Sequence, residues 1–192
     1  MSVRERAPAK VNLCLFLGGV RGDGRHELLT LFESISLCDE LELSVLAEGE
    51  RDEVICPGVE GPNLAHDALR ALRGRGWQAP PVRIEIAKRI PVAAGLGGGS
   101  ADAAAALRLA VRVAPVPEPL VREVAAELGA DVPAQLEPGT SIGTGAGEEV
   151  TPVPALAAHA FLILPSDQKL STADVYREAD RLELPRKAAE LD

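Results

Sequence analysis

The stretch PVAAGLGGGSADAAAAL, residues 91–107, decides the fold because it joins a very flexible loop directly to a strong helix former. Four of the five residues 95–99 are glycine, and Ser100 and an alanine-rich run follow at once. Glycine lets a backbone come close to a ligand, and a helix N-terminus offers free N–H groups with partial positive charge. The stretch therefore predicts a cradle for an anion such as phosphate. The alternative is a tight turn into a helix with no ligand.

Three familiar nucleotide-binding motifs do not fit this loop. The P-loop ends in GK[ST], which is missing here, and the catalytic-loop and metal-binding signatures of protein kinases are absent from the sequence. The dinucleotide fingerprint needs a third glycine where Ser100 stands and an acidic residue closing the next strand, but a second helical pattern follows instead. What remains is a Gly/Ser phosphate loop of the kind that small-molecule kinases use.

Composition restricts the class of protein. With 192 residues, of which 46% are hydrophobic, the chain can bury one good core or two small ones. The 20 Lys and Arg against 29 Asp and Glu give a net charge of −9, which argues against nucleic-acid or membrane partners. No signal peptide or spanning segment is apparent, so we expect a cytoplasmic protein. Its three cysteines form no metal-binding pattern, and we expect reduced core residues.

Hydrophobic periodicity predicts mixed strands and helices. Alternating apolar residues predict half-buried strands at residues 9–20, 39–46 and 82–90, and a continuous apolar run predicts a buried strand at 159–166. Patterns with helical period, opened by Asn63 or Ser171 or closed by Gly129, predict helices at residues 63–73, 120–129 and 171–182. A turn-rich stretch covers 130–154, and the proline-rich segment around residue 154 is the expected domain boundary.

Five blocks of sequence in colinear order carry a resemblance to a known family. They are APAKVNLCL (7–15), RGDGRHELLTLFESISLCDEL (21–41), the glycine-rich stretch, LGADVPAQL (128–136) and STADVY (171–176). Together they resemble the galactokinase, homoserine kinase, mevalonate kinase and phosphomevalonate kinase superfamily, and within it the 4-diphosphocytidyl-2-C-methyl-D-erythritol kinases. The resemblance implies an α+β fold, with a ribosomal-S5-like, ATP-binding N-terminal domain at residues 1–154. It also implies the start of a ferredoxin-like C-terminal domain at 155–192, which we expect to be incomplete.

The implied activity is transfer of the ATP γ-phosphoryl group to a hydroxyl of 4-diphosphocytidyl-2-C-methyl-D-erythritol, with Mg²⁺, in the non-mevalonate isoprenoid precursor pathway. Asp131 matches the catalytic carboxylate, and Lys10 matches the lysine beside it. An ammonium group near the carboxylate keeps it ionised and helps to orient the alcohol. The structural alternatives are a surface lysine on an edge strand and a carboxylate at a turn or helix terminus.

The resemblance also implies the ATP contacts. Ser100 is suited to bond a phosphate or to ligate Mg²⁺, and its structural alternative is a helix cap. Asn63 and Lys88 match residues near the adenine end of ATP, with the alternatives of a helix cap and an exposed strand residue. The remaining contacts implied for ATP belong to the glycine-rich stretch: Pro91, Gly95, Leu96, Gly97, Gly98 and Gly99.

For the acceptor, a small molecule with a cytidine diphosphate group, the resemblance implies a second set of contacts. His26 matches the histidine that recognises cytosine, with Asn12 on the same side of the site and Thr172 near the methylerythritol group. Tyr176 falls where the family stacks an aromatic ring on cytosine, and packing is its structural alternative, as an ordinary surface position is for His26. Arg25 stands where the family has a tyrosine, and a guanidinium can also stack on a base.

Two other functions stay open from the sequence. One is an inactive ATP-binding remnant or fragment, which would bind ATP without turnover. The other is a kinase of the same superfamily that acts on another sugar alcohol or on a homoserine-like alcohol, because Arg25 alters the cytosine pocket.

Overall fold

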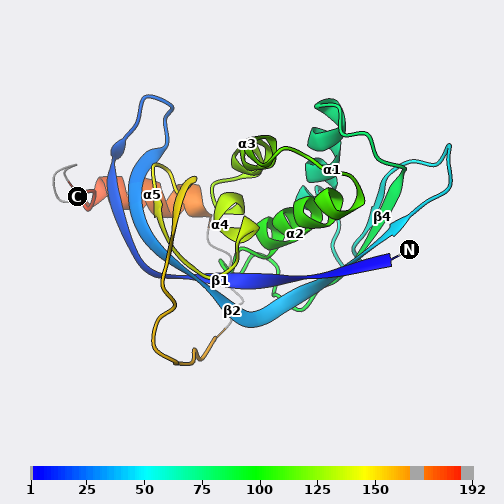
Figure 1. Cartoon of the computed structure of the whole chain (residues 1–192). Helices are drawn as coiled ribbons and strands as arrows, with labels where there is room; N and C mark the ends of the chain where they lie inside the picture. Colours follow the sequence, from blue (N-terminus) through cyan, green and yellow to red (C-terminus); the bar gives the residue numbers. More distant parts are fainter. Residues whose placement is uncertain (1, 165–170, 187–192) are drawn as a thin grey trace.

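Two long strands carry the fold in this computed structural model, which describes residues 2–164 and 171–186. Strands β1 (Ser2–Val20) and β2 (His26–Val45) pair as an antiparallel hairpin along almost their whole length, and Figure 1 shows them bending together. The strands predicted at 9–20 and 39–46 are confirmed, and both extend further towards the N-terminus. Three register shifts interrupt β1, so its side chains change direction relative to β2 along the strand.

The other strands add to β2, which is the centre of a six-stranded sheet. Strand β4 (Val82–Ala87) pairs with the C-terminal part of β2, and β3 (Glu53–Ile55) lies parallel to β4 at the edge. Strand β5 (Thr140–Thr144) pairs with the N-terminal part of β2, and β6 (Glu149–Val153) pairs with β5. One strand therefore links the two halves of the sheet.

The stretch 130–154 is more regular than the turn-rich segment that the sequence predicts. It contains the short helix α4 (Val132–Leu136) and the hairpin of β5 and β6. In β5, the ring of Phe32 from β2 leaves room only for glycine at position 143: a Cβ atom there would lie 2.6 Å from Cε2 of that ring. Small residues hide the alternation on which strand prediction depends.

Three helices cover one face of the sheet (Figure 1). They are α1 (Leu64–Gly74), α2 (Gly98–Val113) and α3 (Glu118–Leu128). Helix α2 packs against α1, α4 and β1, and its alanines 101 and 103–106 are almost completely buried. A helix that is apolar nearly all round must be buried, and alanine allows its neighbours to come close. The N-terminus of α2 is thereby held next to β1.

The predicted helix ends are confirmed. Asn63 accepts a hydrogen bond from the backbone N–H of Ala65 at 2.9 Å, and Gly129 follows the last residue of α3. Ser171 caps α5 (Thr172–Arg181) by accepting from the N–H of Asp174. These ends depend on local side-chain chemistry, which explains why the sequence alone locates them.

The buried strand predicted at 159–166 is wrong for residues 159–164, which form no strand; residues 165 and 166 lie outside the described part. Leu162 and Leu164 are 86% and 80% exposed. A strand needs a neighbour for its backbone N–H and C=O groups, and none of the described strands pairs with this segment.

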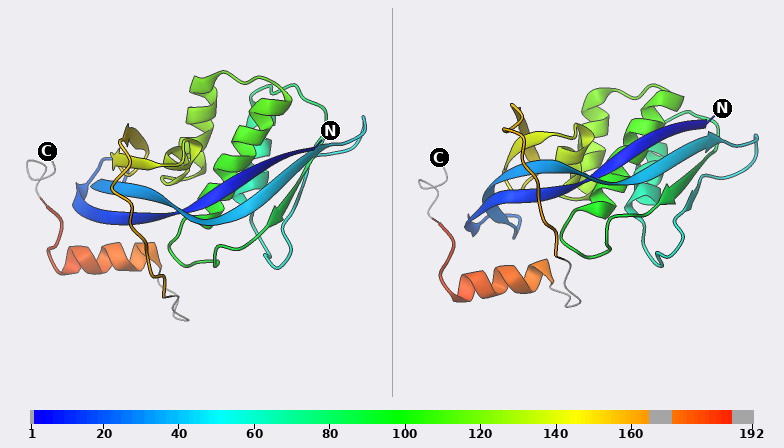
Figure 2. Two further views of the ribbon diagram at one scale, coloured as in Figure 1. Left: turned by 60° about the horizontal axis from the view of Figure 1, so that its bottom comes forward. Right: turned by 90° about the horizontal axis from the view of Figure 1, so that it is seen from below.

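Helix α5 has no buried residue and lies apart from the other helices (Figure 2).

The α+β fold is confirmed, with one mixed sheet and a helical layer. Strand β6 ends at Val153, next to the predicted boundary at residue 154, which stays a prediction. Among the described residues no helix is both long enough and apolar enough to cross a membrane.

We expect Gly143→Ala to destabilise the protein by about 1–3 kcal/mol, because the added methyl group would push against the buried Phe32 ring. Urea denaturation measures the change. Gly139→Ala is the matched control, since a Cβ atom there meets nothing within 4 Å. Equal stability of the two variants would contradict the proposed packing of Phe32 on β5.

Candidate active site

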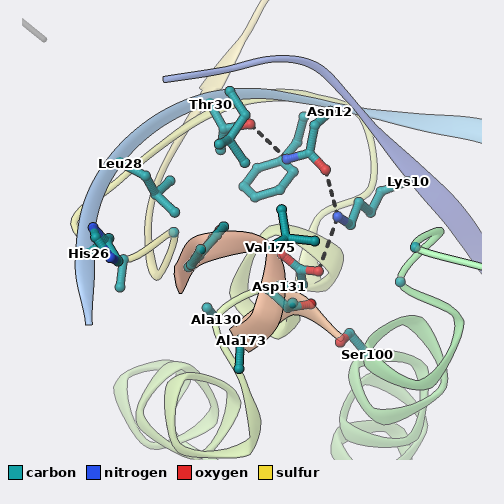
Figure 3. A pocket seen from close by; sticks show the side chains of 18 of the residues that line it. Lys10, Asn12, His26, Leu28, Thr30, Ser100, Ala130, Asp131, Ala173 and Val175 are labelled. Carbon is teal, nitrogen blue, oxygen red and sulfur yellow. Dashed lines mark hydrogen bonds and ion pairs between the residues drawn. The ribbon is translucent and has the colours of Figure 1, made fainter. Parts of the chain in front are cut away.

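Lys10 and Asn12 of β1 and Asp131, which precedes α4, meet in one pocket (Figure 3). The Lys10 Nζ lies 3.1 Å from Oδ2 of Asp131 and donates a hydrogen bond of 2.7 Å to Oδ1 of Asn12. The Asn12 Nδ2 in turn donates to Oγ1 of Thr30 at 2.7 Å. Residues two apart on a strand point to the same face, so β1 presents Lys10 and Asn12 together. Register shifts on both sides of this pair set its direction.

Burial differs sharply across the Lys10–Asp131 ion pair. The Lys10 side chain is 9% exposed, whereas that of Asp131 is 36% exposed. The Lys10 ammonium also lies 5.5 Å from the centre of the Phe32 ring, within the range of a cation–π contact. The lysine is therefore held in place by its surroundings, while the carboxylate remains open to a ligand in the pocket.

This first pocket has a volume of about 1040 Å³. Strands β1 and β2 form one wall, and α5 contributes Thr172, Tyr176 and Asp180 to another. All the residues predicted for catalysis and acceptor binding line it: Lys10, Asn12, Arg25, His26, Asp131, Thr172 and Tyr176. The structure thus brings together residues that lie far apart in the sequence.

His26 is buried at the end of this pocket, so its alternative as an ordinary surface residue is wrong. Its Nδ1 lies 2.9 Å from the carbonyl oxygen of Gly18, and its Nε2 lies 3.2 Å from Oδ2 of Asp180. The Tyr176 ring meets it edge-on, with 5.5 Å between the ring centres. Helix α5 contacts the sheet here through side chains.

Arg25 lies at the rim of the pocket with half of its side chain exposed. Its Nε donates to Oδ2 of Asp23 at 3.0 Å, and Glu148 lies 3.5 Å from the same guanidinium. The guanidinium already has acidic partners in the turns that flank the pocket.

The glycine-rich loop reaches the same place from the other side. Gly97 is the N-cap of α2, with φ of 67°, and Ser100 lies inside the first helical turn. The helix-cap alternative for Ser100 is therefore wrong. The backbone N–H of Lys10 donates to the carbonyl of Leu96 at 2.9 Å, and a Cβ atom on Gly97 would lie 2.9 Å from Cγ of Lys10. Only glycine fits this left-handed position against the lysine.

A second pocket, of about 350 Å³, adjoins the first at this loop, because Gly95, Gly97 and Ser100 line both. All nine residues predicted to contact ATP line the second pocket: Asn63, Lys88, Pro91, Gly95, Leu96, Gly97, Gly98, Gly99 and Ser100. The sequence-based division into two sets of residues thus corresponds to two adjoining pockets.

Lys88 is not the exposed strand residue of its structural alternative. It follows the end of β4, and its Nζ donates to Oδ2 of Asp39 at 2.5 Å and to Oδ2 of Asp102 at 2.7 Å. Both carboxylates are buried, and Oδ1 of Asp102 has no hydrogen-bond partner among the described residues. Asp39 also accepts from two backbone N–H groups, of Arg89 and Ile90.

The Lys88 ammonium group is shared by two carboxylates, those of Asp39 and Asp102, and the pKa values of Lys88 and Asp102 are both shifted. Burial raises the pKa of Asp102 to about 7, and the opposing hydrogen bond from Lys88 does not cancel this effect. Burial also lowers the pKa of Lys88, but the hydrogen bonds to Asp102 and Asp39 raise it more, so the net shift is upward. The lysine thus stays charged, while Asp102 changes charge near neutral pH.

Comparison with known proteins bears on this arrangement. A family model described as "GHMP kinases N terminal domain" matches residues 63–139. A 4-diphosphocytidyl-2-C-methyl-D-erythritol kinase of Salinispora tropica is 43% identical over 94% of the chain, and one of Saccharopolyspora erythraea is 44% identical over 92%. A crystal structure of 4-(cytidine 5'-diphospho)-2C-methyl-D-erythritol kinase, 34% identical, matches 96% of this chain and 67% of its own, with a TM-score of 0.75.

The chain belongs to the GHMP kinases. It spans 59% and 58% of the length of the two curated relatives. A more distant structure, the mevalonate pyrophosphate decarboxylase of Streptococcus pyogenes, shares the fold at a TM-score of 0.65 with only 12% identity.

Three acidic residues of this GHMP kinase escape the sequence analysis. Asp102 leaves a signal, since it is a charged residue inside an apolar helix that starts at the loop. Asp39 and Asp180 leave none, because each meets its partner, Lys88 or His26, across 49 or 154 positions. Only the folded chain reveals such pairs.

We expect Gly97→Ala to cost this GHMP kinase more stability than Gly95→Ala, by about 1–3 kcal/mol. Both glycines have positive φ, so both variants carry the same kind of backbone strain, but only the methyl group at position 97 would collide with Lys10. Urea denaturation of the two variants side by side separates collision from strain. Equal losses would mean that Lys10 does not lie against Gly97.

The stability of the wild-type GHMP kinase should fall as pH rises from about 5 to 8, relative to Asp102→Asn. In the unfolded chain this carboxyl ionises near the ordinary aspartate pKa of 3.8, whereas in the folded chain it holds its proton up to a pKa of about 7. The folded state binds more protons between these values, so its stability is greatest at the acid end of the window and is lost on the way to pH 7.

Urea midpoints at pH 5.5 and 8 measure this effect, which we expect to reach about 1–3 kcal/mol. Glu123→Gln replaces an exposed carboxylate of α3 with an amide, and its stability should change with pH as that of the wild type does. The interpretation of the cluster would be wrong if Asp102→Asn had the same pH dependence as the wild type.

Proposed function

We propose that this GHMP kinase transfers the γ-phosphoryl group of ATP to a hydroxyl of 4-diphosphocytidyl-2-C-methyl-D-erythritol. The observation that carries the proposal is the ion pair of Lys10 and Asp131, 3.1 Å apart where the pocket of the glycine-rich loop adjoins the larger pocket. Phosphoryl transfer needs the attacking hydroxyl in line with the phosphate bond that breaks, and a carboxylate beside that hydroxyl can orient it and accept its proton. The names of the relatives at 43% and 44% identity supply the acceptor.

On the donor side, the phosphates of ATP would occupy the N-terminus of α2. The first backbone N–H groups of this helix have no partner within it, and Gly97 lets a ligand approach closely. Asn63 and Lys88 line the wall of this pocket, where the adenine end would lie. Both side chains already have partners within the protein, so in this proposal they shape the wall and give it charge.

The residues present fit ATP better than they fit a dedicated metal cage. Among the described residues, no group of three or more His, Cys, Asp or Glu side chains is arranged to hold a metal. Magnesium in nucleotide sites is usually held by one or two protein groups together with phosphate oxygens and waters. Ser100, which lines both pockets, is the residue that we propose as its protein ligand, where the ion would neutralise phosphate charge.

On the acceptor side, Asp131 would accept the proton of the acceptor's hydroxyl group. The hydroxyl oxygen would form a bond to the γ-phosphorus, while the bond between the γ-phosphorus and the bridging oxygen of the β-phosphate breaks and ADP is released. Lys10 orients the carboxylate, and two of its three ammonium hydrogens are used by Asp131 and Asn12. The third is then available to a transferring phosphoryl oxygen. Tyr176, His26, Arg25 and Thr172 would hold the remainder of the acceptor.

A kinase for another small alcohol is the second candidate. The exposed guanidinium of Arg25, already bound to Asp23 and Glu148, favours it, because these contacts compete with stacking on a base. A cytoplasmic location and the division into domains at residues 1–154 and 155–192 belong to the same proposal.

The test is ADP release from ATP, Mg²⁺ and 4-diphosphocytidyl-2-C-methyl-D-erythritol. We expect Asp131→Asn to lower kcat at least about 100-fold with little change in ATP affinity, because the amide cannot accept the hydroxyl proton. Glu137→Gln, an exposed substitution directly after α4, should keep full activity.

Substantial turnover by Asp131→Asn would show that another group is the base. No ADP release from the wild-type chain, although it binds ATP, would support an inactive nucleotide-binding protein. Turnover with another alcohol alone would support the second candidate.

A further inference from the structure

Helix α2 carries an arginine whose side chain reaches two other elements of the site. The Arg108 side chain is only 18% exposed, and its guanidinium donates hydrogen bonds in three directions. On β1, Nη2 donates to the carbonyl oxygen of Arg6 at 2.8 Å, and Nε donates to Oε1 of Glu5 at 3.2 Å. On α4, Nη1 donates to the carbonyl oxygen of Gln135 at 2.5 Å. Because a planar guanidinium holds its partners in fixed directions, Arg108 links β1 to α4 through α2.

The two backbone carbonyl groups that accept from Arg108 both lie where secondary structure leaves such groups without partners. Among the described strands, β1 pairs with β2 alone, so the backbone groups along its other edge need partners elsewhere. Arg108 serves the carbonyl of Arg6, and Arg112 of the same helix donates to that of Arg4 at 3.2 Å. Gln135 lies in the last turn of α4, where carbonyl groups have no acceptor site filled within the helix. Arg108 thus anchors the edge of β1 and the end of α4 at once.

The proposed catalytic pair sits on the two elements that this guanidinium links. Lys10 lies four residues after Arg6 on β1, and Asp131 precedes Gln135 by four residues, about one helical turn. Strand β1 and helix α4 both pack against α2, whereas they have few contacts with each other in the described part of the chain. The distance of 3.1 Å between Lys10 and Asp131 therefore depends on how α2 holds both elements.

We propose that Arg108 is a positioning residue, which sets the separation of Lys10 and Asp131 by fixing β1 and α4 to the same helix. This inference rests on the proposed function, because it takes Asp131 as the base for phosphoryl transfer. Arg108 lines neither of the two pockets, so it acts through the residues that it positions. Phosphoryl transfer depends on alignment, and a shift of about 1 Å that originates far from the reacting atoms can lower a rate about 100-fold.

The experiment replaces the guanidinium without removing its charge. Arg108→Lys substitutes a single ammonium group for the planar fork, and that group cannot serve all three acceptors in their present directions. We expect kcat for ADP release to fall at least about tenfold, with the KM for ATP changed by less than about threefold. The KM should be kept because the glycine-rich loop has its own attachment to β1, the hydrogen bond from the N–H of Lys10 to the carbonyl of Leu96.

Arg112→Lys is the matched control. Arg112 lies about one turn further along α2, donates to the carbonyl of Arg4 and pairs with Oε2 of Glu5 at 2.7 Å. Both variants therefore lose an arginine that pairs with Glu5 and covers the edge of β1, but only Arg108 also has a hydrogen bond to α4. Arg112→Lys should keep kcat within about twofold of the wild type.

Chemical labelling reports the same geometry without turnover. The Lys10 side chain is 9% exposed and paired with Asp131, so its acetylation by an amine reagent, followed by mass spectrometry, should be slow in the wild type. Arg108→Lys should speed the labelling of Lys10, because its ion pair opens. The labelling of Lys88, which is 14% exposed in its own buried cluster, should stay unchanged and serves as the internal reference. A general loosening of the fold would speed both.

The outcomes distinguish this inference from the proposed function. Unchanged labelling of Lys10 in Arg108→Lys would overturn the inference, and so would faster labelling of both lysines, which would indicate a loss of stability alone. An equal fall of kcat in Arg108→Lys and Arg112→Lys would also overturn it. No turnover by the wild type would overturn the proposed function, while the labelling would still decide whether Arg108 holds Lys10 against Asp131.

Discussion

The close approach of Gly97 to the aliphatic chain of Lys10 is the constraint on which the site depends. Any side chain at position 97 would occupy the space of Lys10, and its left-handed backbone starts α2 at that point. The hydrogen bond between Lys10 and Leu96 fixes the loop to β1. The N-terminus of α2, Lys10 and Asp131 therefore lie next to one another, where the two pockets adjoin.

The two pockets hold their lysines in different ways, and the difference matters for chemistry. Lys10 pairs with one carboxylate, which is partly exposed and open to a ligand. Lys88 lies between two buried carboxylates, and one oxygen of Asp102 has no partner among the described residues. The first arrangement leaves one carboxylate accessible from the pocket. The second leaves an excess of negative charge in the wall when Asp102 is ionised, which is costly in a buried position.

Rigidity is also unequal across the site. The glycine-rich loop is anchored between the buried alanine-rich helix α2 and strand β1, so the proposed phosphate side is preformed. The opposite wall comes from α5, which has no buried residue and contacts the sheet through His26. Such a wall can adjust to its ligand at little cost in packing free energy. Recognition of the acceptor then depends on polar contacts more than on a fixed shape.

The sequence by itself determined the elements with local causes. Alternation located the C-terminal parts of β1 and β2, glycine and alanine located the loop and α2, and side-chain caps located the ends at Asn63 and Ser171. Family motifs also grouped the candidate residues into two sets that line two adjoining pockets. The tertiary structure decided what depends on distant partners: the β5–β6 hairpin, the exposed 159–164 segment and the contacts of Asp39, Asp102 and Asp180. A strand needs a neighbour and a buried charge needs a counter-charge, and neither partner is adjacent in sequence.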